Sequence, residues 1–122
     1  MDRPSFMTLV EQAVEEVPDE FRMAMQNLQI VVQDWPDPAL MEEVTGDADE
    51  VLYGLYTGTP LPDRGADYGN TTPDVITLFQ GPLEEDFPDR DELCYEIKVT
   101  LIHEIGHYFG FDEDTIERYG YD

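Results

Sequence analysis

The sequence predicts an α+β fold in which a small three-stranded sheet packs against helices. Apolar residues recur at helical spacing over residues 5–15 and again over 91–109. Short runs of β-branched and aromatic residues, bounded by Pro, Gly and Asp, are typical of strands. At 122 residues the chain suits a single domain, 1–122, with one modest core.

The first part of the chain predicts helices followed by a strand. Residues 5–15 form the first amphipathic helix, with Ser5 as its expected N-cap. Pro18 interrupts this pattern, and a second helix is expected over 18–28. "LQIVVQ", residues 28–33, predicts a strand that the following prolines end, and "PALMEEV" predicts one or two helical turns.

The middle of the chain predicts two further strands and the loops that bound them. "VLYGLYTG" (51–58) and "VITLFQ" (75–80) have strand composition. The segment 59–74 between them is rich in Pro, Gly, Asp and Asn, and a loop of that length in a small domain is often functional. Residues 81–91 are expected to close the last strand as a loop.

The longest helical pattern covers residues 91–109, and a short final helix is expected over 112–120. Asp89 or Asp91 can cap the long helix at its start, and Gly110 ends it. Its expected core stripe comprises Leu93, Ile97, Leu101, Ile105 and Tyr108. Outside this helix, Trp35 is expected at the edge of the core.

The chain is strongly acidic, with 29 Asp and Glu against 6 Lys and Arg and a net charge of −23. Such a surface repels phosphates and anionic membranes, so neither nucleic acid nor a membrane is an expected partner. Cationic ligands suit it better. A solvated surface that maintains solubility is the simplest interpretation, with adaptation to high salt and mimicry of nucleic acid as alternatives.

Sequence features also predict a cytoplasmic location. No apolar run approaches the length of a membrane span, and acidic residues interrupt the N-terminal segment where a signal peptide would be apolar. Cys94 is the single cysteine, so no internal disulfide can form. It is expected to fill the core. The sequence does not determine the oligomeric state.

Both histidines of the chain lie in "LIHEIGHYFG", residues 101–110. His103 and His107 are four residues apart, so on a helix their imidazoles share one face and can bind one tetrahedral metal ion. Glu104 lies at the edge of that face, where it can take a proton from a water molecule that the metal acidifies. This His-Glu-x-x-His pattern is typical of zinc peptidases. The simpler alternative is two ordinary histidines beside a solvated glutamate.

A third metal ligand must come from outside the two histidines. Gly110 allows a sharp turn that returns the following "FDED" toward the metal. Glu113 occupies the third ligand position of the pattern His-Glu-x-x-His-x-x-Gly-x-x-His. Glu113 is the first choice and Asp114 the second, with Asp112 and Glu117 as competitors. Zinc is the expected metal, and the ligand set also suits iron, manganese or nickel.

Several segments, taken in order, resemble the small bacterial zincin-like metallopeptidases, or minimal zincins. These segments are "SFMTLVEQAVEEVPDEF", "LQIVVQD", "GLYTGTPLPDRG", "TPDVITLFQGPLEE" and "VTLIHEIGHYFGFDED". The resemblance implies a minimal zincin fold, a metal at His103 and His107, Glu104 as general base and an acidic third ligand near Glu113. Aspartate is common at that third position in the family, whereas this chain has glutamate.

The predicted function is peptide-bond hydrolysis, with a peptide or unfolded protein as substrate. An extended substrate can add to an exposed strand, either 51–57 or 75–79. Candidate donors for the oxyanion are Tyr119, Arg118, Tyr68 and Asn70, and the simpler alternative is that the tyrosines pack with their hydroxyls in water. One alternative is a non-catalytic metal-binding or protein-interaction domain with the zincin shape. The other is an acidic mimic that binds a basic partner, with the motif incidental.

Overall fold

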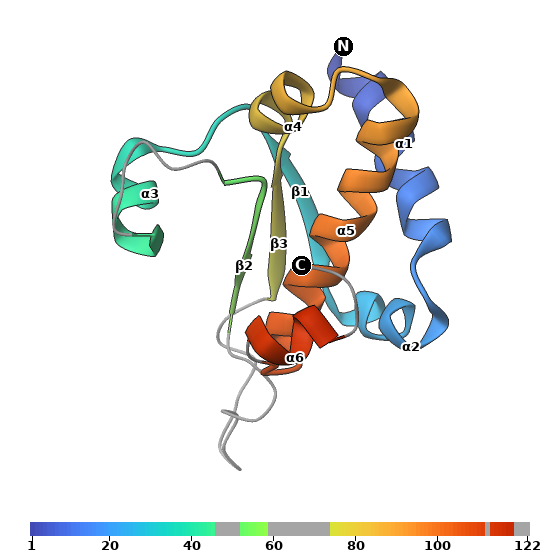
Figure 1. Cartoon of the computed structure of the whole chain (residues 1–122), viewed down its shortest axis with the longest axis vertical. Helices are drawn as coiled ribbons and strands as arrows, with labels where there is room; N and C mark the ends of the chain where they lie inside the picture. The colour runs from blue at the N-terminus through green and yellow to red at the C-terminus, as the bar shows by residue number, and fades with distance from the viewer. Residues whose placement is uncertain (46–51, 59–73, 112, 119–122) are drawn as a thin grey trace.

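The computed structural model describes residues 1–45, 52–58, 74–111 and 113–118, and within them the side chains at 24, 27, 43–45, 113, 116 and 117 are not described. The elements in chain order are α1 (Arg3–Glu16), α2 (Asp19–Arg22), the 3₁₀ turn η1 (Ala24–Asn27), β1 (Gln29–Gln33), α3 (Pro38–Thr45), β2 (Gly54–Thr57), β3 (Val75–Phe79), α4 (Gln80–Asp86), α5 (Arg90–Tyr108) and α6 (Glu113–Arg118). The predicted α+β class is confirmed, with three strands in one mixed sheet (Figure 1).

The sheet has the strand order β1-β3-β2, so the last strand in the chain occupies the centre. β3 pairs parallel with β1, Ile30 opposite Ile76, and antiparallel with β2, Leu55 opposite Thr77. Of the two strands that were expected to offer a free edge, β3 is therefore paired on both sides. In the part of the chain that the structure describes, β2 pairs with β3 alone and keeps its other edge.

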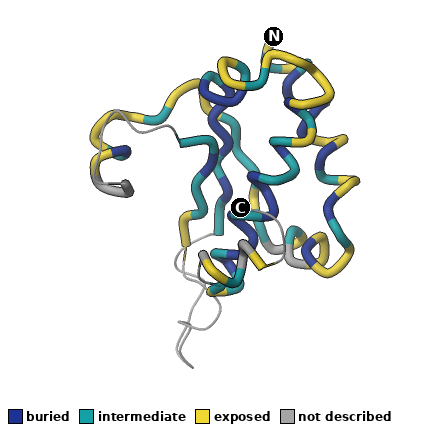
Figure 2. Tube along the Cα trace, viewed as in Figure 1, coloured by how far each residue is buried: buried dark blue, intermediate teal, exposed yellow. Residues whose placement is uncertain are grey.

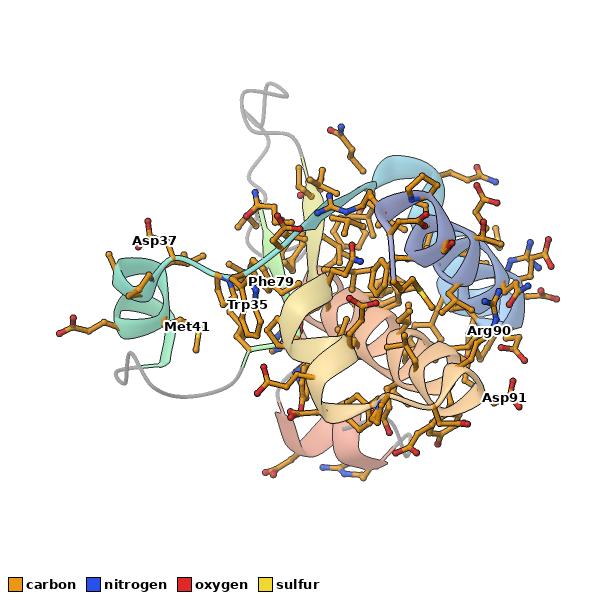
Figure 3. The ribbon with its side chains drawn as sticks, turned by 90° about the horizontal axis from the view of Figure 1, so that it is seen from above. Trp35, Asp37, Met41, Phe79, Arg90 and Asp91 are labelled. Carbon is orange, nitrogen blue, oxygen red and sulfur yellow. The ribbon has the colours of Figure 1, made fainter. Side chains whose placement is uncertain are left out.

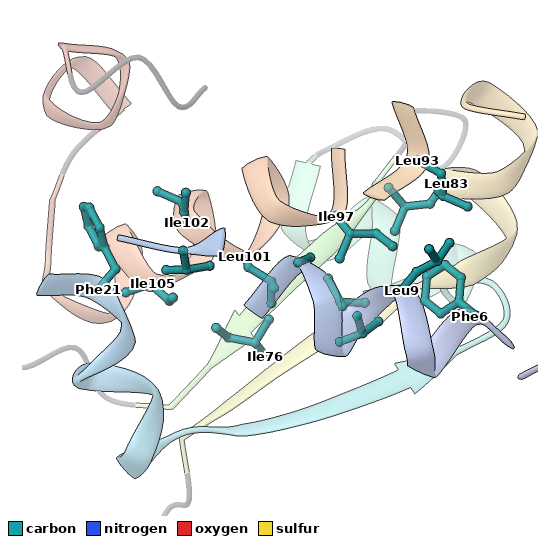
Figure 4. Close-up of a cluster of buried hydrophobic side chains, with 14 of the residues drawn as sticks. Phe6, Leu9, Phe21, Ile76, Leu83, Leu93, Ile97, Leu101, Ile102 and Ile105 are labelled. Carbon is teal, nitrogen blue, oxygen red and sulfur yellow. The ribbon is translucent and has the colours of Figure 1, made fainter. Parts of the chain in front are cut away.

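The core lies where α1 and α5 pack together beside the sheet (Figures 1 and 4). The predicted stripe of α5 is confirmed, because all five of its residues are buried. The same core cluster includes residues from three other elements: Phe6 and Leu9 of α1, Ile76 of β3 and Leu83 of α4. Figure 2 shows this burial concentrated on the facing sides of the two helices and on the central strand.

Aspartates cap both long helices. Asp89, one of the two predicted caps, begins α5, and its side chain accepts a hydrogen bond from the backbone N–H of Glu92 at 3.0 Å. The cap predicted for α1 was wrong: Asp2, not Ser5, is the N-cap, and it accepts from Ser5 N–H at 2.9 Å. The helix extends back to Arg3 because Pro4 is tolerated in the first turn, where backbone N–H groups lack helical partners.

Two segments differ from the predicted elements. Residues 18–28 form the single turn α2 and the separate 3₁₀ turn η1 instead of one helix. Residues 80–86 form the helix α4, where the last residue of a strand and then a loop were expected. Pro82 falls in the first turn of α4, so the residue that was interpreted as a loop signal is compatible with the helix start.

Trp35 is less buried than predicted, since 58% of its surface is exposed. It follows β1 on the extended segment that leads to α3, and Figure 3 shows that segment projecting from the body of the molecule. A Cβ added at Gly81 would collide with the indole ring. The ring therefore packs on the backbone of α4, and glycine at position 81 makes that contact possible.

No helix among the described residues combines the length and the apolar character that a membrane crossing requires.

Candidate metal centre

α5 brings the two histidines together one turn apart, as their spacing predicted. The Nε2 atoms of His103 and His107 are 3.2 Å apart, and their rings meet edge to face with centroids 4.8 Å apart. Both rings are half-buried. The two nitrogens therefore converge on one point beside the helix.

The donor set fits a zinc ion. Two nitrogens at the tetrahedral angle, each about 2.0–2.1 Å from zinc, lie about 3.3–3.4 Å apart. The observed separation of 3.2 Å is close to that value without rearrangement of either ring. One carboxylate oxygen of Glu104 joins the group, and the donor atoms of all three residues lie within 4.8 Å of one another.

Glu104 is buried between α5 and β2, with 7% of its surface exposed. Its Oε1 accepts a hydrogen bond from the backbone N–H of Tyr56 at 2.8 Å, and its Oε2 lies 3.8 Å from His103 Nε2. A buried carboxylate needs such a donor to offset its lost hydration. Glu104 thus connects the motif helix to β2, a contact that the sequence analysis did not foresee.

Gly54 permits the close approach of β2 to α5. A Cβ built on this glycine would lie 2.6 Å from Thr100 Cγ2 and 3.6 Å from Glu104 Cγ. Any larger residue would push the strand away from the helix. The Oγ1 atom of Thr100 donates to the carbonyl of Glu96 at 2.8 Å, which fixes the methyl group against the strand. A lone glycine within a strand-like pattern was the available signal for this contact.

The turn after α5 has the geometry that Gly110 was expected to provide. Gly110 has φ +82°, in the left-handed region that favours glycine. The backbone N–H of Gly110 donates to the carbonyl of His107 at 2.9 Å. The backbone N–H of Phe111 donates to the carbonyl of Gly106, also at 2.9 Å. These two bonds define a Schellman motif, which ends the helix and reverses the chain.

The third ligand stays a prediction. Glu113 opens α6 directly after the turn, but its side chain lies outside the described residues, as do Asp112 and the side chain of Glu117. Asp114 is exposed. Among the side chains that the structure describes, the metal-capable group comprises His103, Glu104 and His107 and does not include Asp114.

The proposed oxyanion donors are similarly untested. Tyr68, Asn70 and Tyr119 lie outside the described ranges, and Arg118 is exposed on α6. Tyr56 was not considered from the sequence, yet it adjoins the centre. Its hydroxyl donates to Asp74 at 2.7 Å, and its ring packs edge-on against Tyr108 with centroids 5.8 Å apart.

A cavity of about 280 Å³ opens beside His103 and Glu104. Its walls are residues 52–54, which lead into β2, and the α5 residues Glu96, Val99 and Thr100. Tyr53 forms part of the wall, and its hydroxyl donates to Asp86. Burial, reinforced by Asp86, raises the pKa of the Tyr53 hydroxyl to about 12.

The fold and the donor set together define a candidate metal site, with His103, Glu104 and His107 on one helix of an α+β protein. A family model described as zincin-like metallopeptidase matches residues 25–121. Because this match covers most of the chain, the protein belongs to the zincin-like metallopeptidase family. No curated protein matches the chain closely enough to add a named relative.

Proposed function

We propose that this protein is a zinc-dependent peptidase that cleaves extended peptides or unfolded proteins, with His103 and His107 as zinc ligands and Glu104 as general base. The observation that carries the proposal is the convergence of the two Nε2 atoms, 3.2 Å apart, beside the buried carboxylate of Glu104. Glu113 is the proposed third ligand, with Asp114 as the alternative. When bound, zinc supplies a Lewis acid that acidifies water and polarises a carbonyl group.

Glu104 is proposed to carry a proton from the attacking water to the leaving amine. The hydrogen bond from Tyr56 N–H holds the carboxylate with Oε2 toward His103. In that position it takes a proton from the attacking water and returns it to the amine that leaves when the peptide bond breaks. The same hydrogen bond limits the rotamers of Glu104, so the base is positioned before substrate binds.

The edge of β2 is the proposed docking strand. The bond from Phe79 N–H to the carbonyl of Tyr53, at 2.9 Å, identifies a hydrogen-bonded pair of the antiparallel ladder. By alternation, the backbone groups of Gly54 and Tyr56 face away from β3. Because Tyr56 N–H already donates to Glu104, a further strand on that side would pair through the backbone of Gly54. A substrate that extended the sheet there would pass the metal centre.

A non-catalytic role has one observation in its favour. The bond between Glu104 and Tyr56 ties α5 to β2, which gives the glutamate a structural function whether or not it handles a proton. Under this alternative the chain is a metal-binding or protein-interaction domain of zincin shape.

Replacing Glu104 separates the two functions. Zinc-loaded wild type and Glu104→Gln are incubated with a pool of unstructured peptides, and products are read by mass spectrometry. The amide oxygen of glutamine can still accept from Tyr56 N–H, so the fold and zinc content should persist while cleavage falls about 1,000-fold. Zinc content and circular dichroism are measured on both proteins, and His103→Ala serves as the metal-deficient control.

Equal cleavage by the two proteins would assign the activity to a contaminant and reject Glu104 as base. Absence of cleavage by both, at full zinc content, would favour the non-catalytic domain. Zinc binding unchanged in both His103→Ala and His107→Ala would reject the metal site itself.

A further inference from the structure

The cavity beside the metal centre extends along the same face of α5 that carries the histidines. One side of the helix carries four polar residues at spacings of three or four: Glu96, Thr100, His103 and His107. His103 and Glu104 form one end of the cavity, and Glu96 lies two turns away. A substrate held at the metal centre would therefore place a neighbouring side chain in this cavity.

The walls of the cavity are mainly apolar, with one carboxylate far from the metal centre. Leu52 and Tyr53 line one side and Val99 the other, while Glu96 carries a negative charge at the end away from Glu104. No side chain among the described residues forms an ion pair or hydrogen bond with the Glu96 carboxylate. Burial raises the pKa of this carboxyl group, and the nearby charge of Glu92 raises it further. A half-buried carboxylate without a cation is incompletely compensated.

We propose that this cavity receives the lysine or arginine side chain of a peptide substrate next to the cleaved bond, and that Glu96 is the specificity-determining residue. The inference rests on the proposed peptidase function. It identifies the substrate class as peptides with a cationic residue beside the scissile bond.

Side-chain length supports a cationic occupant. The seven residues from Glu96 to His103 rise about 10.5 Å along the helix, so a short apolar side chain would leave the carboxylate uncovered. Lysine and arginine have long methylene stems that can pack against Leu52 and Val99 while the charged group pairs with Glu96. The net charge of −23 also attracts cationic peptides to the protein.

Cleavage preference gives the first test. The zinc-loaded protein is supplied with peptides randomised on both sides of a central bond, and mass spectrometry reports the residues that flank each cut. Lysine and arginine should be enriched about 10-fold over norleucine at one flanking position. Glu96→Gln should abolish the enrichment, and Glu96→Lys should turn it toward aspartate and glutamate. Glu92→Gln removes a charge one turn away, outside the cavity, and should keep the preference.

Binding gives a second test that does not depend on cleavage. The probes are N-acetyl-lysine methylamide and its norleucine analogue, titrated against protein with ¹³C-labelled Leu and Val methyl groups. The lysine probe should shift the Leu52 and Val99 methyl signals, with affinity about 10-fold lower in Glu96→Gln and unchanged in Glu92→Gln.

The two tests separate failure of the inference from failure of the proposed function. Cleavage without cationic preference, or equal binding of the two probes, would overturn the role of Glu96 and leave the peptidase intact. Absence of cleavage of every peptide would reject the peptidase function, and the methyl shifts would then decide whether the cavity recognises a cation.

Discussion

The two faces of α5 differ in the polarity and the burial of their residues. The face toward α1 is apolar and fully buried, with Leu93, Ile97, Leu101 and Ile105 in the core. The face toward β2 carries Glu96, Thr100, His103 and His107, which are polar and mostly half-buried. The first face needs apolar volume and tolerates repacking, whereas the second needs particular atoms in particular positions.

This difference places most of the stabilisation on one side of the helix and the candidate metal site on the other. Apolar burial against α1 and β3 holds α5 in place, so β2 can contribute a short strand, a glycine and one backbone N–H to the opposite side. Substitutions on the two faces should therefore have separable effects on stability and on metal chemistry.

The largest expected stability loss comes from the apolar face. Leu101→Ala removes a fully buried side chain and should lower the free energy of unfolding by about 3 kcal/mol. Urea denaturation of the zinc-free protein measures this change. Tyr95→Ala, at a half-exposed position of the same helix, should change stability by less than about 0.5 kcal/mol. If Leu101→Ala weakened zinc affinity in the folded protein, the two faces would not be independent.

An intermediate effect is expected where β2 meets α5. Gly54→Ala brings a methyl group against Thr100 Cγ2 and should cost about 2 kcal/mol, since the strand must move or the threonine must repack. The same displacement should weaken the hydrogen bond between Tyr56 and Glu104. Thr100→Ser removes the opposing methyl group and keeps the hydroxyl, so the double variant should recover stability. Absence of coupling between the two sites in a double-mutant cycle would contradict the contact.

The smallest expected effect concerns Glu96 and changes with pH. Because the folded-state pKa of Glu96 is raised, its protonated form is favoured by folding. That stabilisation is complete below the unfolded-state pKa, near 4.5, and is lost as pH rises through the folded-state value. Glu96→Gln should therefore stabilise the protein at pH 7, by less than about 1 kcal/mol because solvent reaches the group, and show a smaller gain at pH 4. Thermal unfolding at both pH values measures the difference, and a gain that grew on acidification would contradict the assigned shift.

The helices were predictable where local signals agreed. In α5 the apolar stripe, the Asp89 cap and the Gly110 stop all indicated the same helix, and the spacing of His103 and His107 then fixed their relative positions. α4 was missed because Gly81 and Pro82 are loop signals by composition. The segment is nevertheless a helix, because a first turn tolerates proline and because Gly81 lets Trp35 pack on the helix backbone.

The sheet order and the contacts across the site were not predictable from local signals. Which strand lies beside α5 depends on pairing between residues far apart in sequence, such as Leu55 with Thr77 and Ile30 with Ile76. The spacing of Glu96 from His103 was readable in the sequence, but its place in a cavity depends on Leu52 and Tyr53 lying opposite. The third ligand depends on side chains after Gly110 that the structure does not describe.

The central position of β3 also orders the assembly of the molecule during synthesis. β1 and β2 precede β3 in the chain, yet in the described sheet each pairs with β3 and not with the other. Neither strand can find its sheet partner until residues 75–79 have emerged from the ribosome. α4 and then the motif helix α5 follow β3 in the chain, so both histidines are synthesised only after the central strand that pairs with β2. Under the proposed function, a nascent chain that has not yet reached His107 would lack a zinc ligand and could not cleave other chains.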